Sequence, residues 1–296
     1  KVTFDAISNN FHTALRNEVN QYFIDKGINP QGNSTLYAKT FLLFSGVVLL
    51  YTTLVFFTPN SLLLCAALCV LLGINLALIG FNVSHDACHG SYSEKKQLNS
   101  FLGYSFNILG VSSFFWKTKH NLVHHTYTNI YGMDEDIDDK PILRLLPHGK
   151  LNFIHRYQHI YAPFIYSLAT LGWTLNKDFK QLIRYNKNGL TKGTGGNPTT
   201  EMIKLIFSKI FYFAFIFGLP LLFTDYNFGF ILLGFLVLQV TTGLFVTTIF
   251  QLAHVIEDTD HPVPTDNGEI ENAWAIHQLE TTANFAKKNR IAAWIE

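Results

Sequence analysis

Two short motifs gather histidines at spacings that suit metal binding. His85-Asp86-Ala87-Cys88-His89 places imidazoles at positions i and i+4, which share one face of a helix. A second motif, His120-Asn121-Leu122-Val123-His124-His125, repeats that spacing and adds a neighbouring imidazole turned by about 100°. Neutral imidazole suits iron, zinc and copper, so the spacing leaves the metal open. The motifs predict a metal centre with the ligands His85, His89, His120, His124 and His125.

Polar residues beside these motifs have candidate supporting roles. Asp86 can accept a hydrogen bond from one ring nitrogen of a ligand, so that the other nitrogen faces the metal. Gln251 lies one turn before His254, after an apolar run, and can orient that histidine or a bound water. Three residues before the second motif are expected either to contact an anionic substrate headgroup or to anchor the chain at a membrane interface: Trp116, Lys117 and Lys119.

The chain that must position these histidines has the composition of a membrane protein. Of its 296 residues, 48% are hydrophobic and only 15% are charged, against about 25% charged in soluble domains. The net charge of +1 gives no indication of a nucleic-acid partner. Cys65, Cys69 and Cys88 do not form the pattern of a disulfide framework, so we expect reduced thiols.

Four apolar runs are long enough to cross a bilayer, which takes about 17–25 residues. Short turns, Thr58-Pro59-Asn60 and Thr224-Asp225-Tyr226-Asn227, separate them pairwise, and the third run carries Lys204 and Lys209 near its start. Because a backbone in lipid must satisfy its own hydrogen bonds, we predict an all-α integral membrane fold with four transmembrane helices in two hairpins. The runs are Phe41–Phe57, Ser61–Asn82, Met202–Phe223 and Phe228–Phe250.

Basic residues predict the orientation of the hairpins. Neither short turn contains Lys or Arg, whereas residues 83–200 contain thirteen. By the positive-inside rule, both termini and the histidine motifs face the cytoplasm. Within residues 83–200, Leu98–Trp116 and Ile160–Leu175 are predicted to be amphipathic helices at the membrane surface. The Gly-rich stretch Asn186–Thr200 is predicted to be an exposed linker.

These elements are expected to form a single domain over residues 1–296. Its parts are an N-terminal cytoplasmic segment (1–40), a first hairpin (41–82), a cytoplasmic helical cap that carries the histidine motifs (83–200), a second hairpin (201–250) and a C-terminal cytoplasmic segment (251–296).

The two motifs, HDACH followed by HNLVHH, resemble the first two histidine boxes of the membrane fatty acid desaturase family. The stretch HHTYTNIYGMDEDID (His124–Asp138) resembles the acyl-lipid and linoleoyl-CoA, or front-end, branch, and the resemblance covers nearly the whole chain. It implies two non-haem iron ions that activate O2 and remove hydrogens from an acyl chain carried by CoA or by a lipid. It also implies that His254 is a metal ligand, although His254 could instead be a residue at the membrane boundary. It implies that Asp136 supports the metal site, although the acidic run around Asp136 could instead be a solvated turn.

The family's third box, of the form QxxHH or HxxHH, is expected shortly after Asn284–Trp294, and the chain ends at Glu296 without it. We therefore expect the chain to be truncated before this box, with an incomplete ligand set. His277 lies in the segment that resembles the lead-in to the box, where we expect a structural or supporting role. The N-terminal segment of about 40 residues has no haem-binding histidine motif, so a separate electron donor of the ferredoxin or cytochrome b5 type is expected.

Two alternatives remain open from the sequence. A lipid hydroxylase on the same scaffold would share the histidine pattern. A non-catalytic metal-binding membrane protein, such as a metal transporter, should instead place polar groups at mid-membrane, where these runs have few.

Overall fold

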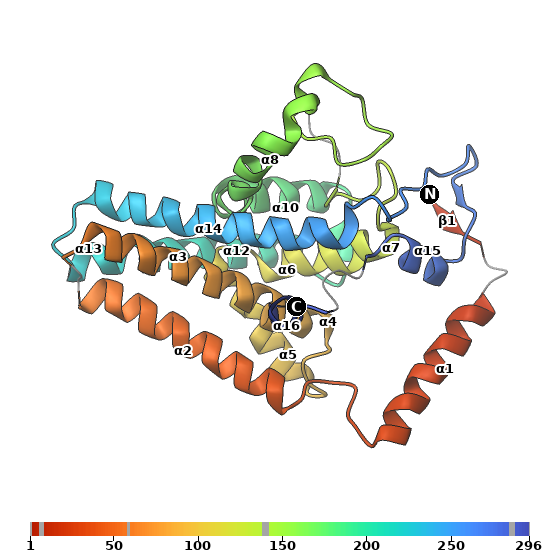
Figure 1. Cartoon of the computed structure of the whole chain (residues 1–296), viewed down its shortest axis with the longest axis horizontal. Helices are drawn as coiled ribbons and strands as arrows, with labels where there is room; N and C mark the ends of the chain where they lie inside the picture. Colours follow the sequence, from red (N-terminus) through yellow and green to blue (C-terminus); the bar gives the residue numbers. More distant parts are fainter. Residues whose placement is uncertain (1, 6–8, 58–59, 138–141, 284–287, 296) are drawn as a thin grey trace. The chain divides into compact units, whose positions relative to one another are not determined.

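The computed structural model describes residues 2–5, 9–57, 60–137, 142–283 and 288–295, and these residues are mostly helical (Figure 1). Within these described residues, four helices are long and apolar enough to cross a membrane: Ser34–Phe56, Leu62–His89, Pro198–Phe223 and Phe228–His254. The predicted all-α fold with four membrane-spanning helices is confirmed. Thr58 and Pro59, in the first predicted turn, lie outside the described residues.

The chain divides into two compact units, which are described separately. Unit 1 consists of residues 1–30, 119–162 and 249–293. Unit 2 consists of residues 31–118, 163–248 and 294–296, and it holds nearly all of the membrane-spanning helices.

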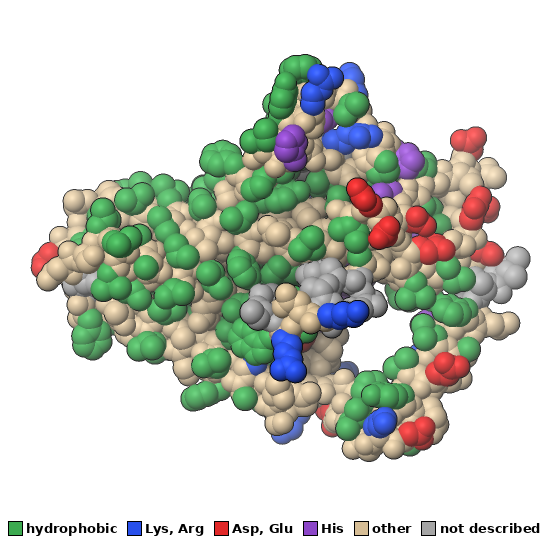
Figure 2. Space-filling model, viewed as in Figure 1, with side chains coloured by type: hydrophobic (Ala, Val, Ile, Leu, Met, Phe, Trp, Pro, Cys, Tyr) green, Lys and Arg blue, Asp and Glu red, His purple; other side chains and the backbone are tan. Residues whose placement is uncertain are grey.

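The helical hairpins make up most of unit 2. Their helices are α2 (Ser34–Phe56), α3 (Leu62–Ile79), α4 (Asp86–His89), α12 (Pro198–Phe213), α13 (Leu219–Phe223) and α14 (Phe228–His254). A π-helical turn, Gly80–His85, joins α3 to α4, and another, Ala214–Gly218, joins α12 to α13. Figure 2 shows hydrophobic side chains over the visible face of α2, α3 and α14, where charged side chains are few. Such a face suits contact with lipid.

Local capping explains where these helices begin. The Asn33 side chain accepts a hydrogen bond from the Leu36 backbone N–H, so α2 starts seven residues before the apolar run at Phe41. The Asn197 side chain likewise accepts from Thr199 and Thr200, and Pro198 fills the first position of α12. Asparagine at the N-cap followed by proline is a favourable helix start.

The remaining helices of the chain are shorter, and they correct two sequence predictions. Leu98–Trp116 is not one helix, because Gly110 adopts a left-handed φ of 76° and Ser112 caps a new helix. The predicted linker Asn186–Thr200 includes a helical turn with Thr191 fully buried. The shorter elements are α1 (Asn9–Lys26), α5 (Lys96–Gly103), a 3-10 turn (Tyr104–Leu109), α6 (Ser113–Lys117), α7 (His125–Tyr127), a 3-10 turn (Phe153–Tyr157), α8 (Gln158–Ser167), α9 (Ala169–Gly172), a π-helical turn (Trp173–Lys177), α10 (Asp178–Lys187), α11 (Leu190–Gly193), α15 (Trp274–Glu280) and α16 (Arg290–Ile295).

Unit 2 contains an ion pair inside its core. Lys209 of α12 is 4% exposed, and its Nζ lies 2.9 Å from the carboxylate of Asp178, which is fully buried at the start of α10. The same ammonium donates to the carbonyl oxygens of Gly110 and Trp173, and Asp178 accepts from the Ser112 backbone N–H at 2.8 Å. This pair therefore ties the segment before α6 to two helices.

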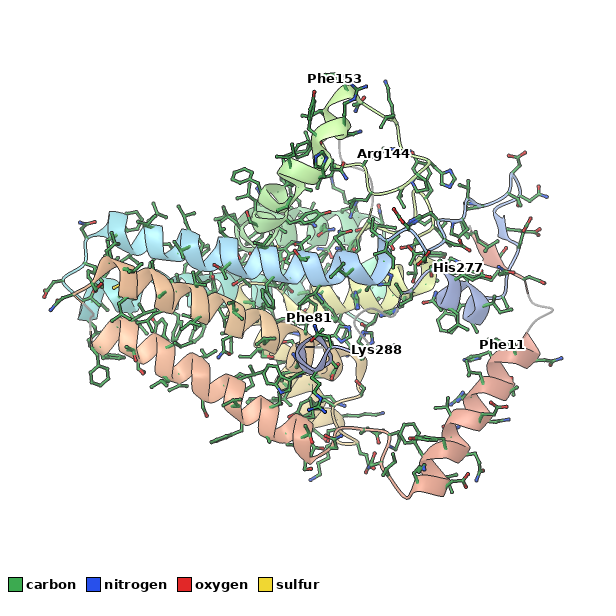
Figure 3. The ribbon with its side chains drawn as sticks, viewed as in Figure 1. Phe11, Phe81, Arg144, Phe153, His277 and Lys288 are labelled. Atoms are coloured by element: carbon green, nitrogen blue, oxygen red, sulfur yellow. The ribbon has the colours of Figure 1, made fainter. Side chains whose placement is uncertain are left out.

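Unit 1 contains a small parallel sheet that the sequence did not predict. Strand β1 (Thr3–Phe4) pairs with β2 (Glu269–Ile270), with Thr3 opposite Glu269. The Phe4 ring packs 5.2 Å from the ring of His277, which is buried on α15 and labelled in Figure 3. The sheet thus covers the C-terminal segment next to the histidine cluster described below.

Candidate metal centre

The second histidine motif forms a compact cluster in unit 1. A π-helical turn, Thr118–His124, leads directly into α7, and π-helical turns occur often at functional sites. The His120 and His124 rings stack with centroids 5.0 Å apart, and the His125 ring lies 4.7 Å from His120 and 5.3 Å from His124. The motif therefore brings all three imidazoles together.

His254, the last residue of α14, joins this cluster. Its Nε2 lies 3.3 Å from the Nε2 of His124, although the two residues are 130 positions apart. The Phe250 ring packs 5.4 Å from both rings, and both histidines are buried. The structure thus brings together the second motif and the histidine that the sequence placed at the end of the last apolar run.

The separation of these two nitrogens fits a shared metal ion. Imidazole nitrogens bind a metal at about 2.0–2.1 Å, so two of them at adjacent positions on one ion lie about 3.0–3.4 Å apart. The observed 3.3 Å between His124 and His254 falls in that range. Without an ion, two buried imidazoles with facing nitrogens share at most one proton. The donor set of unit 1 therefore fits a transition metal such as iron.

Asp134 holds His124 from behind. Its fully buried carboxylate accepts a hydrogen bond from His124 Nδ1 at 2.8 Å and from the backbone N–H groups of Asn129 and Asp136 at 3.1 and 2.9 Å. A carboxylate on Nδ1 fixes the tautomer in which Nε2 is free to bind a metal. The supporting role of Asp134 was not predicted from the sequence, because no local pattern distinguishes Asp134 from the acidic residues that follow it.

Asn129 connects Asp134 to His254. It has a left-handed φ of 58°, which suits asparagine better than most residues. Its buried Nδ2 lies 2.9 Å from the carbonyl oxygen of His254 and 3.2 Å from that of Thr281. The Thr281 carbonyl also accepts from His254 Nδ1 at 3.2 Å. His124 and His254 are therefore both held at Nδ1, by Asp134 and by the Thr281 carbonyl oxygen. Asn129 donates hydrogen bonds to both of these acceptors.

Asp136 and Lys119 form a second contact at this cluster. The Lys119 ammonium pairs with Asp136, whose other oxygen lies 3.9 Å from His120 Nδ1 and 4.0 Å from His124 Nδ1. Asp136 is thus near the predicted ligands, as expected for a supporting residue. Lys119 is only 5% exposed, so the expected headgroup contact does not fit its position, because its charge already has a buried partner.

The first histidine motif lies in unit 2, where α3 gives way to α4. The His85 and His89 rings lie 4.5 Å apart, and Asp86 accepts a hydrogen bond from His85 Nδ1 at 3.1 Å. Trp116 meets both rings edge-on, at 5.5 and 6.1 Å, and packs on Phe106. Trp116 therefore packs beside these imidazoles, and its role as a headgroup contact or an interface anchor stays a prediction.

The remaining predicted residues have other surroundings. Lys117 is exposed, so it stays available to an anionic group. Gln251 does not hold His254, whose Nδ1 is bonded to Thr281. His155, which lies outside both histidine motifs, accepts a hydrogen bond from the Asn152 backbone N–H at the start of a 3-10 turn. His277 is 1% exposed, and burial lowers its pKa, so it stays neutral.

Comparisons with known proteins agree with this chemistry. The profile of the family described as "Fatty acid desaturase" matches residues 60–295. The chain is 34% identical over 296 residues to an sn-1 linoleoyl-lipid 6-desaturase of Arthrospira platensis, covering 99% of this chain and 78% of that relative. It is 35% identical over 287 residues to an enzyme of the same description from Synechocystis sp., covering 96% of this chain and 78% of that relative.

A third relative is an acyl-lipid (8-3)-desaturase of Physcomitrium patens, which is 29% identical over 292 residues, covering 96% of this chain and 59% of that relative. No solved structure gives a significant match. The chain belongs to the fatty acid desaturase family. It is a membrane-bound, O2-dependent oxidoreductase that introduces a double bond into an acyl chain. These relatives support the desaturase over the hydroxylase and over the non-catalytic metal-binding protein.

Proposed function

We propose that this desaturase acts on lipid-linked acyl chains with a non-haem di-iron centre. The proposed ligands include His85 and His89 from unit 2 and His120, His124, His125 and His254 from unit 1. One observation carries this proposal: the Nε2 atoms of His124 and His254 face each other at 3.3 Å, while Asp134 and Thr281 hold their Nδ1 atoms. When bound, the irons would supply the O2 activation that removal of hydrogens from an unactivated chain requires.

The protein's own residues prepare the site for that chemistry. A buried carboxylate and a carbonyl oxygen accept the Nδ1 hydrogens of the two imidazoles, which fixes the tautomer with Nε2 directed at the metal site. Phe250 packs on His124 and His254 and excludes water from their shared side. Desaturation of one bond consumes O2, two electrons and two protons and releases two waters. We propose that a separate ferredoxin or cytochrome b5 supplies the electrons on the cytoplasmic side, where we also place both termini.

The relatives suggest the substrate and the position of the new double bond. Two of them are described as linoleoyl-lipid 6-desaturases, so we propose linoleoyl chains esterified to a membrane lipid, with the new double bond at carbon 6. The complete gene should be expressed in a host that makes linoleoyl lipids, and the fatty acids of each lipid class analysed by gas chromatography and mass spectrometry. A new triene in the lipid fraction is expected. Hydroxylated chains, or products only in the acyl-CoA pool, would contradict the proposal.

A polar pocket in unit 2 suggests where the lipid headgroup binds. The pocket has a volume of about 180 Å³ and is bounded by Ala87 and Cys88 of the first motif and by Asn107, Lys117 and Lys204. Lys204 is paired with Glu201 at 2.7 Å, whereas Lys117 is exposed at the end of α6. We therefore assign the contact with an anionic headgroup to Lys117.

Replacing Lys117 by alanine is expected to raise KM for an anionic lipid substrate and to leave kcat within about twofold. A lysine near an anionic lipid surface contributes about 1 kcal/mol, which corresponds to about a fivefold change in KM. Lys180→Ala, which removes an exposed lysine of α10 outside this pocket, is the matched control. Equal KM values for the two variants, or a fall in kcat alone, would contradict the assignment.

A further inference from the structure

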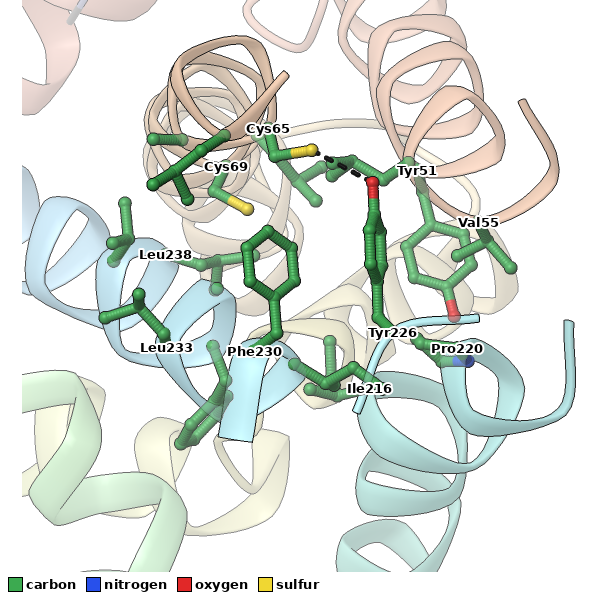
Figure 4. Close-up of a pocket in the computed structure, with 18 residues that line it drawn as sticks. Tyr51, Val55, Cys65, Cys69, Ile216, Pro220, Tyr226, Phe230, Leu233 and Leu238 are labelled. Carbon is green, nitrogen blue, oxygen red and sulfur yellow. Dashed lines mark hydrogen bonds between the residues drawn. The ribbon is translucent and has the colours of Figure 1, made fainter. Parts of the chain in front are cut away.

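A second pocket lies among the membrane-spanning helices of unit 2 (Figure 4), and none of the residues that line it is a histidine. It has a volume of about 340 Å³ and is lined by parts of α2, α3, α13 and α14 together with Tyr226. Its size falls at the lower end of the range of about 300–1,000 Å³ that is usual for ligand sites. The close-up shows Cys65 and Cys69 of α3 on one wall and Phe230, Leu233 and Leu238 of α14 on another.

The walls of this pocket offer almost no polar atoms. The Tyr51 hydroxyl donates to the carbonyl oxygen of Phe215 at 2.5 Å, and the Tyr226 hydroxyl lies 3.2 Å from Cys65 Sγ. Their hydroxyl groups are therefore already hydrogen-bonded, and the other lining side chains are apolar apart from the thiols. A site of this kind does not hold ordered water, which needs two to four polar partners. Its natural occupant is a hydrocarbon chain.

Two of the residues that line the pocket are exposed at the surface of membrane-spanning helices. Leu62 is 62% exposed and Leu233 is 50% exposed, and both lie in helices that can cross a membrane. An occupant that enters between them comes from the bilayer. A Cβ at position 234 would meet Cys69 Sγ at 3.5 Å, an ordinary contact distance, so a side chain added there would lie beside Cys69.

The pocket lies too far from the first histidine motif to hold the end of the reacting chain. On the continuous helix Leu62–His89, its nearest lining residue, Leu72, precedes His85 by thirteen residues, and Cys65 precedes it by twenty, which are about 20 and 30 Å at 1.5 Å per residue. An extended chain advances about 1.2 Å per bond, so eighteen carbons reach about 20 Å. A substrate with its sixth carbon beside His85 therefore ends before the pocket begins.

We propose that this pocket binds one acyl chain of a bilayer phospholipid that is not the substrate. The bound chain fills the space between the two hairpins at the end opposite the histidines. This acyl chain would supply the packing contacts that the side chains of the pocket otherwise lack. Its loss would leave a cavity between the membrane-spanning helices. All residues that line the pocket belong to unit 2. Binding of the acyl chain there does not require that the enzyme turns over.

Cys65 and Cys69 provide the test, because both line the pocket. Cys88 lines the proposed headgroup pocket instead, so its labelling reports lipid binding at that second place. The purified protein should be delipidated in detergent and treated with N-ethylmaleimide, with and without dioleoylphosphatidylcholine, and labelling of each cysteine followed by peptide mass spectrometry. At a lipid concentration ten times Kd, we expect about tenfold slower labelling of Cys65 and Cys69. No protection of these two cysteines would overturn the proposal.

Two variants distinguish the proposed bound phospholipid acyl chain from the acyl chain of the substrate. Gly234→Phe fills the pocket, whereas Leu232→Phe adds the same ring at an exposed position of α14 that does not line it. We expect the lipid to lose its effect on labelling of Cys65 and Cys69 in Gly234→Phe and to keep it in Leu232→Phe. A shift of Gly234→Phe toward shorter acyl substrates would mean that the reacting chain enters the pocket and would overturn the proposal. The labelling needs no turnover, so its failure is distinct from a failure of the proposed desaturation.

Discussion

Replacing Asp134 by asparagine is expected to lower the affinity of the protein for iron by about 10–100-fold, the usual effect of losing a carboxylate behind a metal-binding histidine. The asparagine has the same size, but its single carbonyl oxygen can accept from only one of the backbone N–H groups of Asn129 and Asp136, which bond to different oxygens of Asp134. It lacks the charge that polarises His124 Nδ1 at 2.8 Å. The measurement is iron per chain, after dialysis against a series of chelator concentrations, for the protein expressed from its complete gene.

Asp258→Asn is the matched control for this change. Asp258 is exposed and lies four residues after His254, so the substitution alters the charge of unit 1 equally without touching the cluster. Substitution with Co²⁺ tests the role of Asp134 further. If Asp134 only orients His124, the visible spectrum of the Asp134→Asn protein at saturating Co²⁺ should match that of the wild type. A changed spectrum would mean that Asp134 is itself a ligand, and unchanged iron affinity would mean that it does not support the site.

The metal ligands could be predicted from local spacing in the sequence, whereas the residues that hydrogen-bond to their Nδ1 atoms could not. His120, His124 and His125 are found within six residues, so a motif reveals them. Asp134 reaches His124 across ten positions, and Thr281 reaches His254 across 27. These contacts depend on how a loop closes on itself, which the sequence pattern does not specify. A left-handed residue such as Asn129 also has no marker in a single sequence, because asparagine is common in ordinary turns.

The membrane-spanning helices were predictable for a different reason. Their length and apolarity follow from the thickness of the bilayer, so four runs gave four helices, with ends extended by the caps at Asn33 and Asn197. The shorter elements between the hairpins follow no such rule. Gly110 and Ser112 divide the predicted helix Leu98–Trp116, since a left-handed residue and a new N-cap end one helix and begin another.

Lys209 shows the limit of reading charge from the sequence. A lysine near the start of an apolar run is expected to extend toward the membrane surface. Lys209 instead points into unit 2, where Asp178, 31 positions earlier, neutralises it. Its neighbour on the same helix, Lys204, has a side chain that is 53% exposed and pairs with Glu201. The two lysines therefore look alike in the sequence, but the Lys209 side chain is buried and the Lys204 side chain is exposed.

Replacing Lys209 by methionine is expected to destabilise the protein by about 3–5 kcal/mol, because it leaves the Asp178 carboxylate buried without its counter-charge. For a chain of this size, with an unfolding entropy of about 2.1 cal/mol/K per residue, that corresponds to a fall in melting temperature of roughly 5–8 °C. Lys180→Met, at an exposed position of α10, is the matched control and should change stability by less than about 1 kcal/mol, as is usual for a surface substitution. The double variant Asp178→Asn, Lys209→Met removes both charges and should recover most of the loss. Differential scanning fluorimetry in detergent compares all four proteins.

The pH dependence identifies the unpaired carboxyl as the cause. Burial raises the pKa of Asp178, and the Lys209 ammonium opposes that rise, so Lys209→Met should raise the pKa further. A carboxyl whose folded pKa exceeds its unfolded value of about 3.9 binds more protons in the folded state, and stability then falls as pH rises between the two values. The single variant should therefore lose more stability at about pH 8 than at about pH 5 relative to wild type, and the double variant should not. A pH-independent loss, or a double variant as unstable as the single one, would show that Lys209 acts through packing rather than charge.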